Sequence, residues 1–229
     1  MARLRIRDLG IQIGHLPTGQ HNAITDVPEV LVGHTTIIHE KPRVSRTGVT
    51  LILPRNGYID TDRAFAGHYS FNGNGEMTGL LWVKESGMLG SPIGITNTHQ
   101  VGIVRDALVA NEIQKGLQGW FLPVVAETYD GFLNDIGAFH VTQDHVFQAI
   151  ASATSGPIEE GNVGGGTGMM CHGFKGGIGT ASRIAETQTG QYVVGALVQA
   201  NYGVRHLLRV DGVPVGREIG PDHTPLPGQ

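Results

Sequence analysis

The sequence predicts a layered α/β fold, and three observations support that prediction. Glycine accounts for 35 of the 229 residues and is spread along the whole chain, which favours short strands and turns over long helices. Several short segments are apolar on both faces, as strands are when layers cover both sides of a sheet. Two longer segments carry apolar residues at helical spacing and can provide a covering layer.

The expected strands are short apolar runs bounded by turn residues. Near the start, Arg3, Arg5 and Arg7 alternate with other residues, which suits the solvent-facing side of a first strand. Three apolar runs are expected as strands: residues 48–54, ended by a proline; residues 121–126; and residues 191–201, which are apolar on both faces. Asp211 and Gly212 form a turn signal that predicts a hairpin over residues 206–216.

Two helices are expected between these strands. Thr98 can cap a helix over residues 99–116, which Gly116 terminates. Its apolar positions are Val101, Val104, Leu108 and Ile113. Thr142 can cap a second helix over residues 143–154. The apolar face of this second helix consists of Val146, Phe147, Ile150 and Ala151.

The glycine-rich stretch "GNVGGGTGMMCHGFKGGIGTASR" at residues 161–183 needs a physical reason, because glycine loses much backbone entropy on folding. It is not a Walker loop, since Gly176 follows Lys175 where Ser or Thr is required. The third glycine of a dinucleotide fingerprint is also missing. Interleaved apolar residues argue against a flexible linker. Close-packed backbone is left, either as plain structural packing or around a reaction site.

Composition and charge argue against several classes of function. The formal net charge is −4 and the isoelectric point is near 6.2, so no nucleic-acid partner is expected. No segment has the ~18 apolar residues of a membrane span, and no signal peptide is expected. Cys171 is the only cysteine, which excludes a disulfide within the chain and fits a cytoplasmic protein. The 11 histidines lack metal-binding spacing, so neither a metal nor another cofactor is expected.

No familiar nucleophile motif is present. No serine lies in G-x-S-x-G, and Cys171 beside His172 is interpreted as a small buried hydrophobe. Polar residues instead follow the apolar strands. They are Glu127, Tyr129, Asp130 and Asn134 after residues 121–126, and Gln199, Asn201 and Tyr202 at the end of residues 191–201. Residues 72–79 and 96–99 add further amides and hydroxyls. Such residues either form a site at the strand ends or cap strands and turns.

Six stretches, in order, resemble one known family. They are "NAITDVPEVLVGHTT", "NGNGEMTG", "PIGITNTHQVGIVRDA", "AETYDGFLNDI", "EGNVGGGTGMMCHGFKGGIGTASR" and "VGALVQANYGVRHLLRVDGVPVGRE". They run from residue 22 to residue 218 and resemble the self-processing aminopeptidases, which comprise L-aminopeptidase/D-amidase-esterases and β-peptidyl aminopeptidases. Six motifs in family order are far more specific than any single glycine pattern.

The resemblance implies a four-layer αββα sandwich, similar to that of the N-terminal-nucleophile hydrolases but differently connected. It implies a precursor that cuts itself into a larger α chain and a smaller β chain, whose first residue, Ser or Thr, is the nucleophile. Residues 1–229 are then expected to be a single domain, the α chain, with residues 220–229 as an extended tail near the self-cleavage point. Gln229 is expected to lie close to that point. Tetramers of αβ pairs are also implied.

The resemblance also implies site residues. Asn201 matches the oxyanion-hole asparagine and Tyr129 the active-site tyrosine, while Glu127 and Trp120 match positions that line the substrate pocket. The implied activity releases the amino-terminal L-, D- or β-residue from short peptides, amides or esters. Two alternatives stay open. One is a biosynthetic amidase of the same fold acting on a pantetheine-type substrate, and the other is a non-catalytic binding protein that kept the fold.

Overall fold

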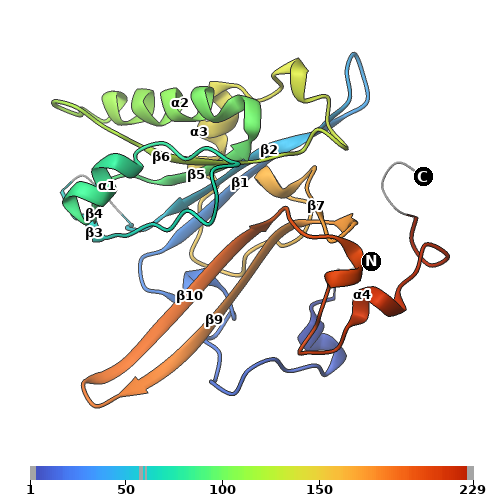
Figure 1. The fold of residues 1–229 in the computed structure, drawn as a ribbon. Helices are drawn as coiled ribbons and strands as arrows, with labels where there is room; N and C mark the ends of the chain where they lie inside the picture. Colours follow the sequence, from blue (N-terminus) through green and yellow to red (C-terminus); the bar gives the residue numbers. More distant parts are fainter. Residues whose placement is uncertain (1–3, 57–58, 60, 226–229) are drawn as a thin grey trace.

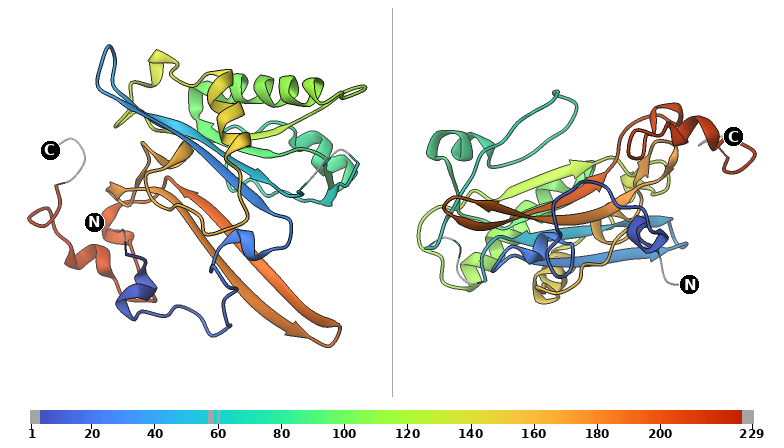
Figure 2. Two further views of the ribbon diagram at one scale, coloured as in Figure 1. Left: turned by 180° about the vertical axis from the view of Figure 1, so that it is seen from behind. Right: turned by 90° about the horizontal axis from the view of Figure 1, so that it is seen from below.

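The computed structural model describes residues 4–56, 59 and 61–225 and shows the layers of an α/β fold (Figure 1). Helices α2 (Val101–Gln114) and α3 (Gln143–Ala151) cover one face of a four-stranded sheet. A two-stranded sheet, β9 (Gly177–Thr187) and β10 (Gly190–Ala200), lies on the other face of that sheet (Figure 2). The α/β class is therefore confirmed, and the layers follow the order helix, sheet, sheet.

The four-stranded sheet has the order β1–β2–β5–β6. Its strands are β1 (Leu31–His39), β2 (Ser45–Leu53), β5 (Ile93–Asn97) and β6 (Val124–Thr128). The pairs β1–β2 and β2–β5 are antiparallel, whereas β5 and β6 are parallel, with Thr96 opposite Glu127. Helix α2 is the crossover that a parallel pair requires. Because β5 and β6 are parallel, their carboxyl ends lie at the same edge of the sheet.

The main hydrophobic core lies between this sheet and the two helices. Its buried side chains are Ile37, Val49, Leu51, Val101, Val104, Ala107, Leu108, Phe121, Val125, Val141, Val146 and Ala149. Both helices lie where the sequence predicts them, with two differences. Asn97 rather than Thr98 caps the turn η3 (Thr98–Gln100) before α2, because its side chain accepts a hydrogen bond from His99 N at 3.1 Å. In α3, Ala149 faces the core and Ala151 is exposed.

The hairpin of β9 and β10 is covered on one face only. Leu197 packs into a second core cluster with Val32 and Ile52 of the larger sheet and with Val30, which precedes β1. On the opposite face, Val194 and Val198 are 63% and 49% exposed. The prediction that residues 191–201 are buried on both faces is therefore wrong for this chain. The physical reason is that the described residues cover only one side of β10.

Two further sequence predictions are corrected. Residues 6–9 form the short helix η1 (Ile6–Leu9) instead of a strand, because Arg5 turns inward to an ion pair with Glu160 at 2.7 Å. Arg3 lies outside the described residues. Asp211 and Gly212 do form a two-residue turn, with φ of 50° and 83°, and it closes an antiparallel β-bridge between Val210 and Val213. The hairpin predicted over residues 206–216 does not extend beyond that bridge. The flanking residues form η6 (Arg205–Leu207) and α4 (Val215–Glu218).

Short elements connect the layers. They are η2 (Ile24–Asp26), β3 (Ala64–Phe65), α1 (Leu80–Ser86), β4 (Met88–Leu89), η4 (Ile136–Ala138), η5 (Gly164–Gly166), β7 (Met170–Cys171) and β8 (Phe174–Lys175).

Across residues 4–56, 59 and 61–225, no helix has the length and apolar character needed to cross a membrane. The same residues contain no group of three or more His, Cys, Asp or Glu side chains placed to hold a metal ion.

The carboxy-terminal segment folds back as a turn, where an extended tail is expected. Thr224 N donates a hydrogen bond to Gly220 O at 3.3 Å. The guanidinium of Arg205, which is only 7% exposed, donates to the carbonyl oxygens of Thr224 and, at 3.1 Å, Pro225. These bonds hold the turn against the body of the chain. Gln229 lies outside the described residues.

Candidate active site

Polar side chains meet where strands of the two sheets end. Strands β5 and β6 end at Asn97 and Thr128, and β10 ends at Ala200. Gln199 Nε2 donates a hydrogen bond to Thr128 Oγ1 at 2.5 Å, so the ends of β6 and β10 are in contact. The carboxyl ends of parallel strands are where open α/β sheets tend to bind ligands.

Asn201 and Tyr129, the two candidate catalytic residues, are joined directly. Asn201 Oδ1 accepts a hydrogen bond from Tyr129 N at 3.0 Å. Asn201 Nδ2 donates to Tyr129 O at 3.1 Å and to Met170 O at 3.2 Å. We call these three bonds the Asn201 clamp. Both N–H groups of the amide are therefore engaged with main-chain carbonyls in this conformation.

A cavity of about 510 Å³ opens beside the clamp. It is lined by Tyr129, Phe132, Met170, Gly173, Asn201, Tyr202, Gly203, Val204 and Arg205. Tyr129 and Phe132 pack edge to face with ring centroids 5.5 Å apart and form an aromatic wall. No serine, threonine or cysteine is among these lining residues, so this part of the chain supplies the cavity with no aliphatic hydroxyl or thiol nucleophile.

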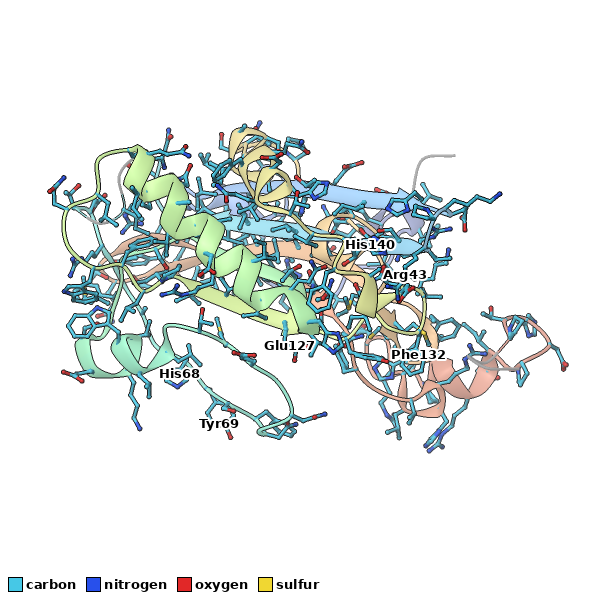
Figure 3. All side chains as sticks on the ribbon, turned by 90° about the horizontal axis from the view of Figure 1, so that it is seen from above. Arg43, His68, Tyr69, Glu127, Phe132 and His140 are labelled. Atoms are coloured by element: carbon cyan, nitrogen blue, oxygen red, sulfur yellow. The ribbon has the colours of Figure 1, made fainter. Side chains whose placement is uncertain are left out.

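Glu127 lies near the end of β6, two residues before Tyr129, but does not line this cavity. Figure 3 shows it on the side of the sheet that faces the loop carrying His68 and Tyr69. Its Oε2 accepts a hydrogen bond from Thr98 Oγ1, which follows the end of β5. The carboxylate is half-buried and is thus held beside the strand ends, where it can meet a cation.

Trp120 is not brought to the same place. It lies before β6, whereas Tyr129 lies after that strand, so the two residues are at opposite ends of β6. The Trp120 ring packs edge to face on Trp82, with centroids 4.9 Å apart, and lines a separate cavity of about 190 Å³. The structure therefore joins Tyr129 and Asn201 directly and holds Glu127 near the same end of β6 but outside their cavity, whereas Trp120 lies at the opposite end of that strand.

Asp130 is a second carboxylate that follows β6, but it is fully buried and faces the protein interior. Its Oδ1 accepts a hydrogen bond from Asn134 Nδ2 at 3.1 Å, while its Oδ2 has no partner in the described part of the chain. Burial raises the pKa of the Asp130 carboxyl, against the lowering effect of its hydrogen bond from Asn134. Because it is inaccessible, Asp130 is excluded as a residue that contacts substrate, and Glu127 is the carboxylate left at the site.

The glycine-rich stretch packs between the two sheets. Gly164, Gly165 and Gly166 form η5 and are all buried. A Cβ atom added to Gly165 would lie 2.5 Å from Gln199 Oε1 and 2.7 Å from Ile95 O, which is too close for any side chain. The glycines are thus required for close backbone approach next to the strand ends that form the site. No part of the stretch has the pattern of a phosphate site.

Cys171 and His172 do not form a catalytic pair in this structure. Cys171 is a free, half-buried thiol in β7. The His172 ring bonds through Nδ1 to Val204 O at 3.0 Å and packs edge to face on Tyr202. Half-burial of the thiol departs from the buried hydrophobe that the sequence predicts.

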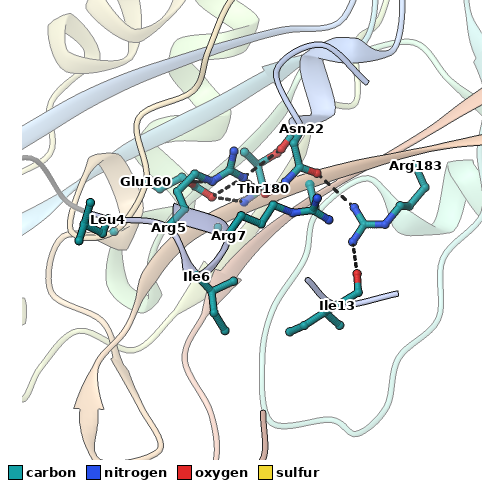
Figure 4. Close-up of a pocket in the computed structure, with 12 residues that line it drawn as sticks. Leu4, Arg5, Ile6, Arg7, Ile13, Asn22, Glu160, Thr180 and Arg183 are labelled. Atoms are coloured by element: carbon teal, nitrogen blue, oxygen red, sulfur yellow. Dashed lines mark hydrogen bonds and ion pairs between the residues drawn. The ribbon is translucent and has the colours of Figure 1, made fainter. Parts of the chain in front are cut away.

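Three arginines line a larger cavity of about 550 Å³ at the amino-terminal segment (Figure 4). Arg5 is ion-paired to Glu160, and Arg183 donates to Asn22 Oδ1 at 3.1 Å and to Ile13 O at 2.8 Å. Arg5 and Arg183 thus bind groups of their own chain and fasten the first residues to β9. This cavity shares no residue with the one beside the Asn201 clamp.

Comparison with known proteins shows which family and which solved structures the chain resembles. The model of peptidase family S58 matches residues 22–225. The β-peptidyl aminopeptidase BapA of Sphingosinicella microcystinivorans is 50% identical over 228 residues, which are 96% of this chain and 57% of that protein. BapA of Sphingosinicella xenopeptidilytica is 46% identical over 229 residues, 96% of this chain and 56% of that protein. The chain therefore spans little more than half the length of these relatives.

Solved structures give the same picture. A Burkholderia sp. β-aminopeptidase aligns with a TM-score of 0.94 and 57% identity, covering 98% of this chain and 64% of that one. The L-aminopeptidase D-Ala-esterase/amidase of Ochrobactrum anthropi aligns with a TM-score of 0.86 and 47% identity, covering 94% and 62%. The latter is described as a prototype of the serine aminopeptidases and a new variant of the Ntn hydrolase fold.

Proposed function

The chain belongs to peptidase family S58, and on that premise we propose that it is the α chain of a self-processed aminopeptidase or amidase. The observation that supports the proposal most is the site itself. An amide and an aromatic wall line its cavity and a carboxylate is held near the same end of β6, yet no serine, threonine or cysteine lines that cavity. A nucleophile from a second chain, cut from the same precursor, completes this arrangement. The curated relatives are long enough to include such a chain, since this one spans 57% of the first of them.

In the proposed reaction, the hydroxyl of a Ser or Thr at the start of the β chain adds to the scissile carbonyl carbon. Its proton passes to the α-amino group of the same residue, whose ordinary pKa of about 7.7–8.0 suits a general base near neutral pH. The carbonyl π electrons move to the oxygen and form an oxyanion. Collapse of this intermediate expels the amine, which takes the proton, and water then hydrolyses the acyl-enzyme by equivalent steps.

Asn201 is proposed to stabilise the oxyanion. Its Nδ2 donates to two main-chain carbonyls, so it must exchange its bond to Tyr129 O or Met170 O for one to the oxyanion. The bond from Tyr129 N to Oδ1 can hold the amide in place during that exchange. Tyr129 is proposed to orient the substrate through the aromatic wall that it forms with Phe132.

Glu127 is proposed to bind the free amino terminus of the substrate. An ammonium group that leaves water for a partly closed site needs a carboxylate partner, and charge-assisted hydrogen bonds of this kind are among the strongest in proteins. The named relatives act on β-, L- and D-residues, so we propose amino-terminal residues of these types as substrates. Trp120 stays a substrate-binding proposal that depends on the family resemblance alone.

The partner proposed for this chain is the β chain, and β10 is the surface that it would cover. Among the described residues β10 pairs only with β9, and the side chains of Val194 and Val198 on its outer face are exposed. Further strands and a second outer helix layer would bury this face and complete the four-layer sandwich. Tetramers of αβ pairs are proposed from the family resemblance.

Two measurements test the proposed function. The complete precursor is expressed, and denaturing gels with mass spectrometry are expected to show two fragments, the smaller beginning with Ser or Thr. The processed enzyme is expected to hydrolyse an amino-acid p-nitroanilide and to leave its N-acetyl form uncut. An uncut, inactive product would instead support a non-catalytic protein, and equal rates on both substrates would exclude an aminopeptidase.

A further inference from the structure

The two carboxylate oxygens of Glu127 have different surroundings. Oε2 accepts the hydrogen bond from Thr98 Oγ1. Oε1 lies under the backbone of Gly75, where an added Cβ would be 3.0 Å from it. Within residues 4–56, 59 and 61–225, no hydrogen bond to Oε1 is present. One oxygen is therefore anchored, and the other is free to accept a proton donor from outside.

We propose that Thr98 and Gly75 are the positioning residues of the amino-terminus site. Thr98 fixes the carboxylate of Glu127 by its hydrogen bond to Oε2, and Gly75, by lacking a side chain, leaves Oε1 open to the substrate ammonium. This inference rests on the proposed function, in which Glu127 binds that ammonium. It adds two specificity-determining residues that never touch the reacting atoms.

Both positions are held by the fold. Thr98 directly follows β5, and the parallel register places Asn97 opposite Thr128, so Thr98 comes beside Glu127 without a long connection. The Asn97 side chain fixes the start of the turn that carries Thr98. The paired ends of β5 and β6 thus position the Thr98 hydroxyl next to Glu127, and this position does not depend on a mobile loop.

Gly75 is fixed by the residues that follow it. Met77 forms a β-bridge with Ala126, and Thr78 N donates to Val125 O at 2.9 Å. Thr78 Oγ1 also donates to Pro123 O at 2.7 Å. The end of the loop is therefore tied to β6 on the same strand as Glu127. A side chain at position 75 could not move aside freely and would occupy the space in front of Oε1.

The loop provides a matched control. Gly73 and Gly75 lie in the same loop, and neither has a positive φ, so alanine is compatible with the backbone at both. A Cβ at Gly73 would meet nothing within 4 Å. Gly75→Ala tests the open oxygen, whereas Gly73→Ala changes the loop by the same methyl group without approaching Glu127.

The experiment measures kcat and KM of processed enzyme for an amino-acid p-nitroanilide, with circular dichroism melts for every variant. Glu127→Gln is the reference variant, because it removes the carboxylate charge completely. Its KM is expected to be about 10–100-fold higher than that of wild type, with kcat less affected. Gly75→Ala is expected to reach a similar KM, and Gly73→Ala to stay within twofold of wild type. Thr98→Val is expected to raise KM about tenfold, and Thr98→Ser to restore it, because serine keeps the hydroxyl.

The outcomes separate the two levels of the argument. If Glu127→Gln itself leaves KM unchanged, the ammonium site of the proposed function is wrong. If Glu127→Gln raises KM while Gly75→Ala and Thr98→Val both match wild type, only the positioning roles are wrong. If Gly75→Ala fails to fold, the contrast between Thr98→Val and Thr98→Ser decides: equal KM values would overturn the inference, and rescue by serine would support it.

Discussion

Replacing Asn201 separates its structural bonds from its proposed catalytic role. Asn201→Ala removes all three bonds of the clamp. Net contributions of about 0.5–1.5 kcal/mol per hydrogen bond predict a loss of about 1.5–4.5 kcal/mol in the free energy of unfolding. Tyr129 is 45% exposed, so water can replace part of these bonds and the lower half of that range is expected. Loss of an oxyanion donor adds a fall of about 10²–10³ in kcat with little change in KM.

Asn201→Asp makes a sharper test of the same residue. The variant keeps an acceptor for Tyr129 N, but it places a carboxylate against the carbonyl oxygens of Tyr129 and Met170, where the amide donated. Repulsion from these oxygens and from the oxyanion should make it less active than Asn201→Ala. Tyr129→Phe should affect processing less, because the ring and the main-chain bonds to Asn201 are kept.

The assay follows self-cleavage of the precursor on gels, kcat on a small amide, and thermal unfolding. Self-cleavage and substrate hydrolysis pass through equivalent oxyanions, so both rates should fall together. If Asn201→Ala cuts itself and turns over substrate at wild-type rates while its melting temperature falls, Asn201 is a structural clamp and has no part in the mechanism. An unchanged melting temperature would instead refute the stabilising role of the clamp.

Three further predictions follow from burial and packing. The raised pKa of Asp130 means that the folded protein binds this proton more tightly than the unfolded chain does. The free energy that the protonated carboxyl contributes to folding is therefore complete below the unfolded pKa of about 3.9, and it is lost as the pH rises through the folded pKa. Melts of wild type against Asp130→Asn should therefore show wild type gaining relative stability as the pH is lowered from 7 towards 4, and parallel pH curves would contradict this. Gly165→Ala should destabilise by about 1–3 kcal/mol in denaturant melts because its Cβ meets Gln199 Oε1 and Ile95 O, whereas Gly179→Ala, with nothing within 4 Å, should not. Residues 1–229 expressed alone should be inactive and should aggregate through the uncovered β10, and a soluble, cooperatively unfolding monomer in light scattering would count against that expectation.

Sequence patterns correctly predict those strands and helices whose apolar faces are buried by other parts of this chain. The strand around Val49 and Leu51 and the helix from Val101 to Leu108 lie where predicted, because their apolar residues pack against one another in a single core. The apolar run of β10 gave the strand correctly but not its exposure, since burial depends on what covers it and not on its own residues. The sequence places Arg5 on the solvent-facing side of a strand, which is wrong. Its ion-pair partner, Glu160, is 155 residues away in the sequence, so no local pattern reveals the pair.

The site was only partly predictable for the same reason. Strand-end polar residues identified Glu127, Tyr129 and Asn201, but the clamp between Tyr129 and Asn201 joins positions 72 residues apart. The sequence predicts that Thr98 caps a helix, which is the ordinary role of a threonine before a helix. Its bond to Glu127 arises from the parallel pairing of β5 with β6, which local spacing does not encode. Asp130 is the opposite case: its polarity and its place after a strand suggest a site residue, but the structure shows that it is buried.

The buried glycine turn η5 has a consequence for how the family can vary. Gly165 lies between Ile95 of one sheet and Gln199 of the other, and Gln199 in turn bonds Thr128 at the end of β6. On the Ile95 side the neighbour of Gly165 is a main-chain carbonyl, which cannot be moved away by choosing another rotamer, and on the other side it is the Gln199 amide, which is held by its bond to Thr128. Substitution of Gly165 by any larger residue would push apart the strand ends next to Tyr129 and Asn201. Selection on the rate of the reaction should therefore act on a position that never meets a substrate, and compensating changes should appear on the opposing strand.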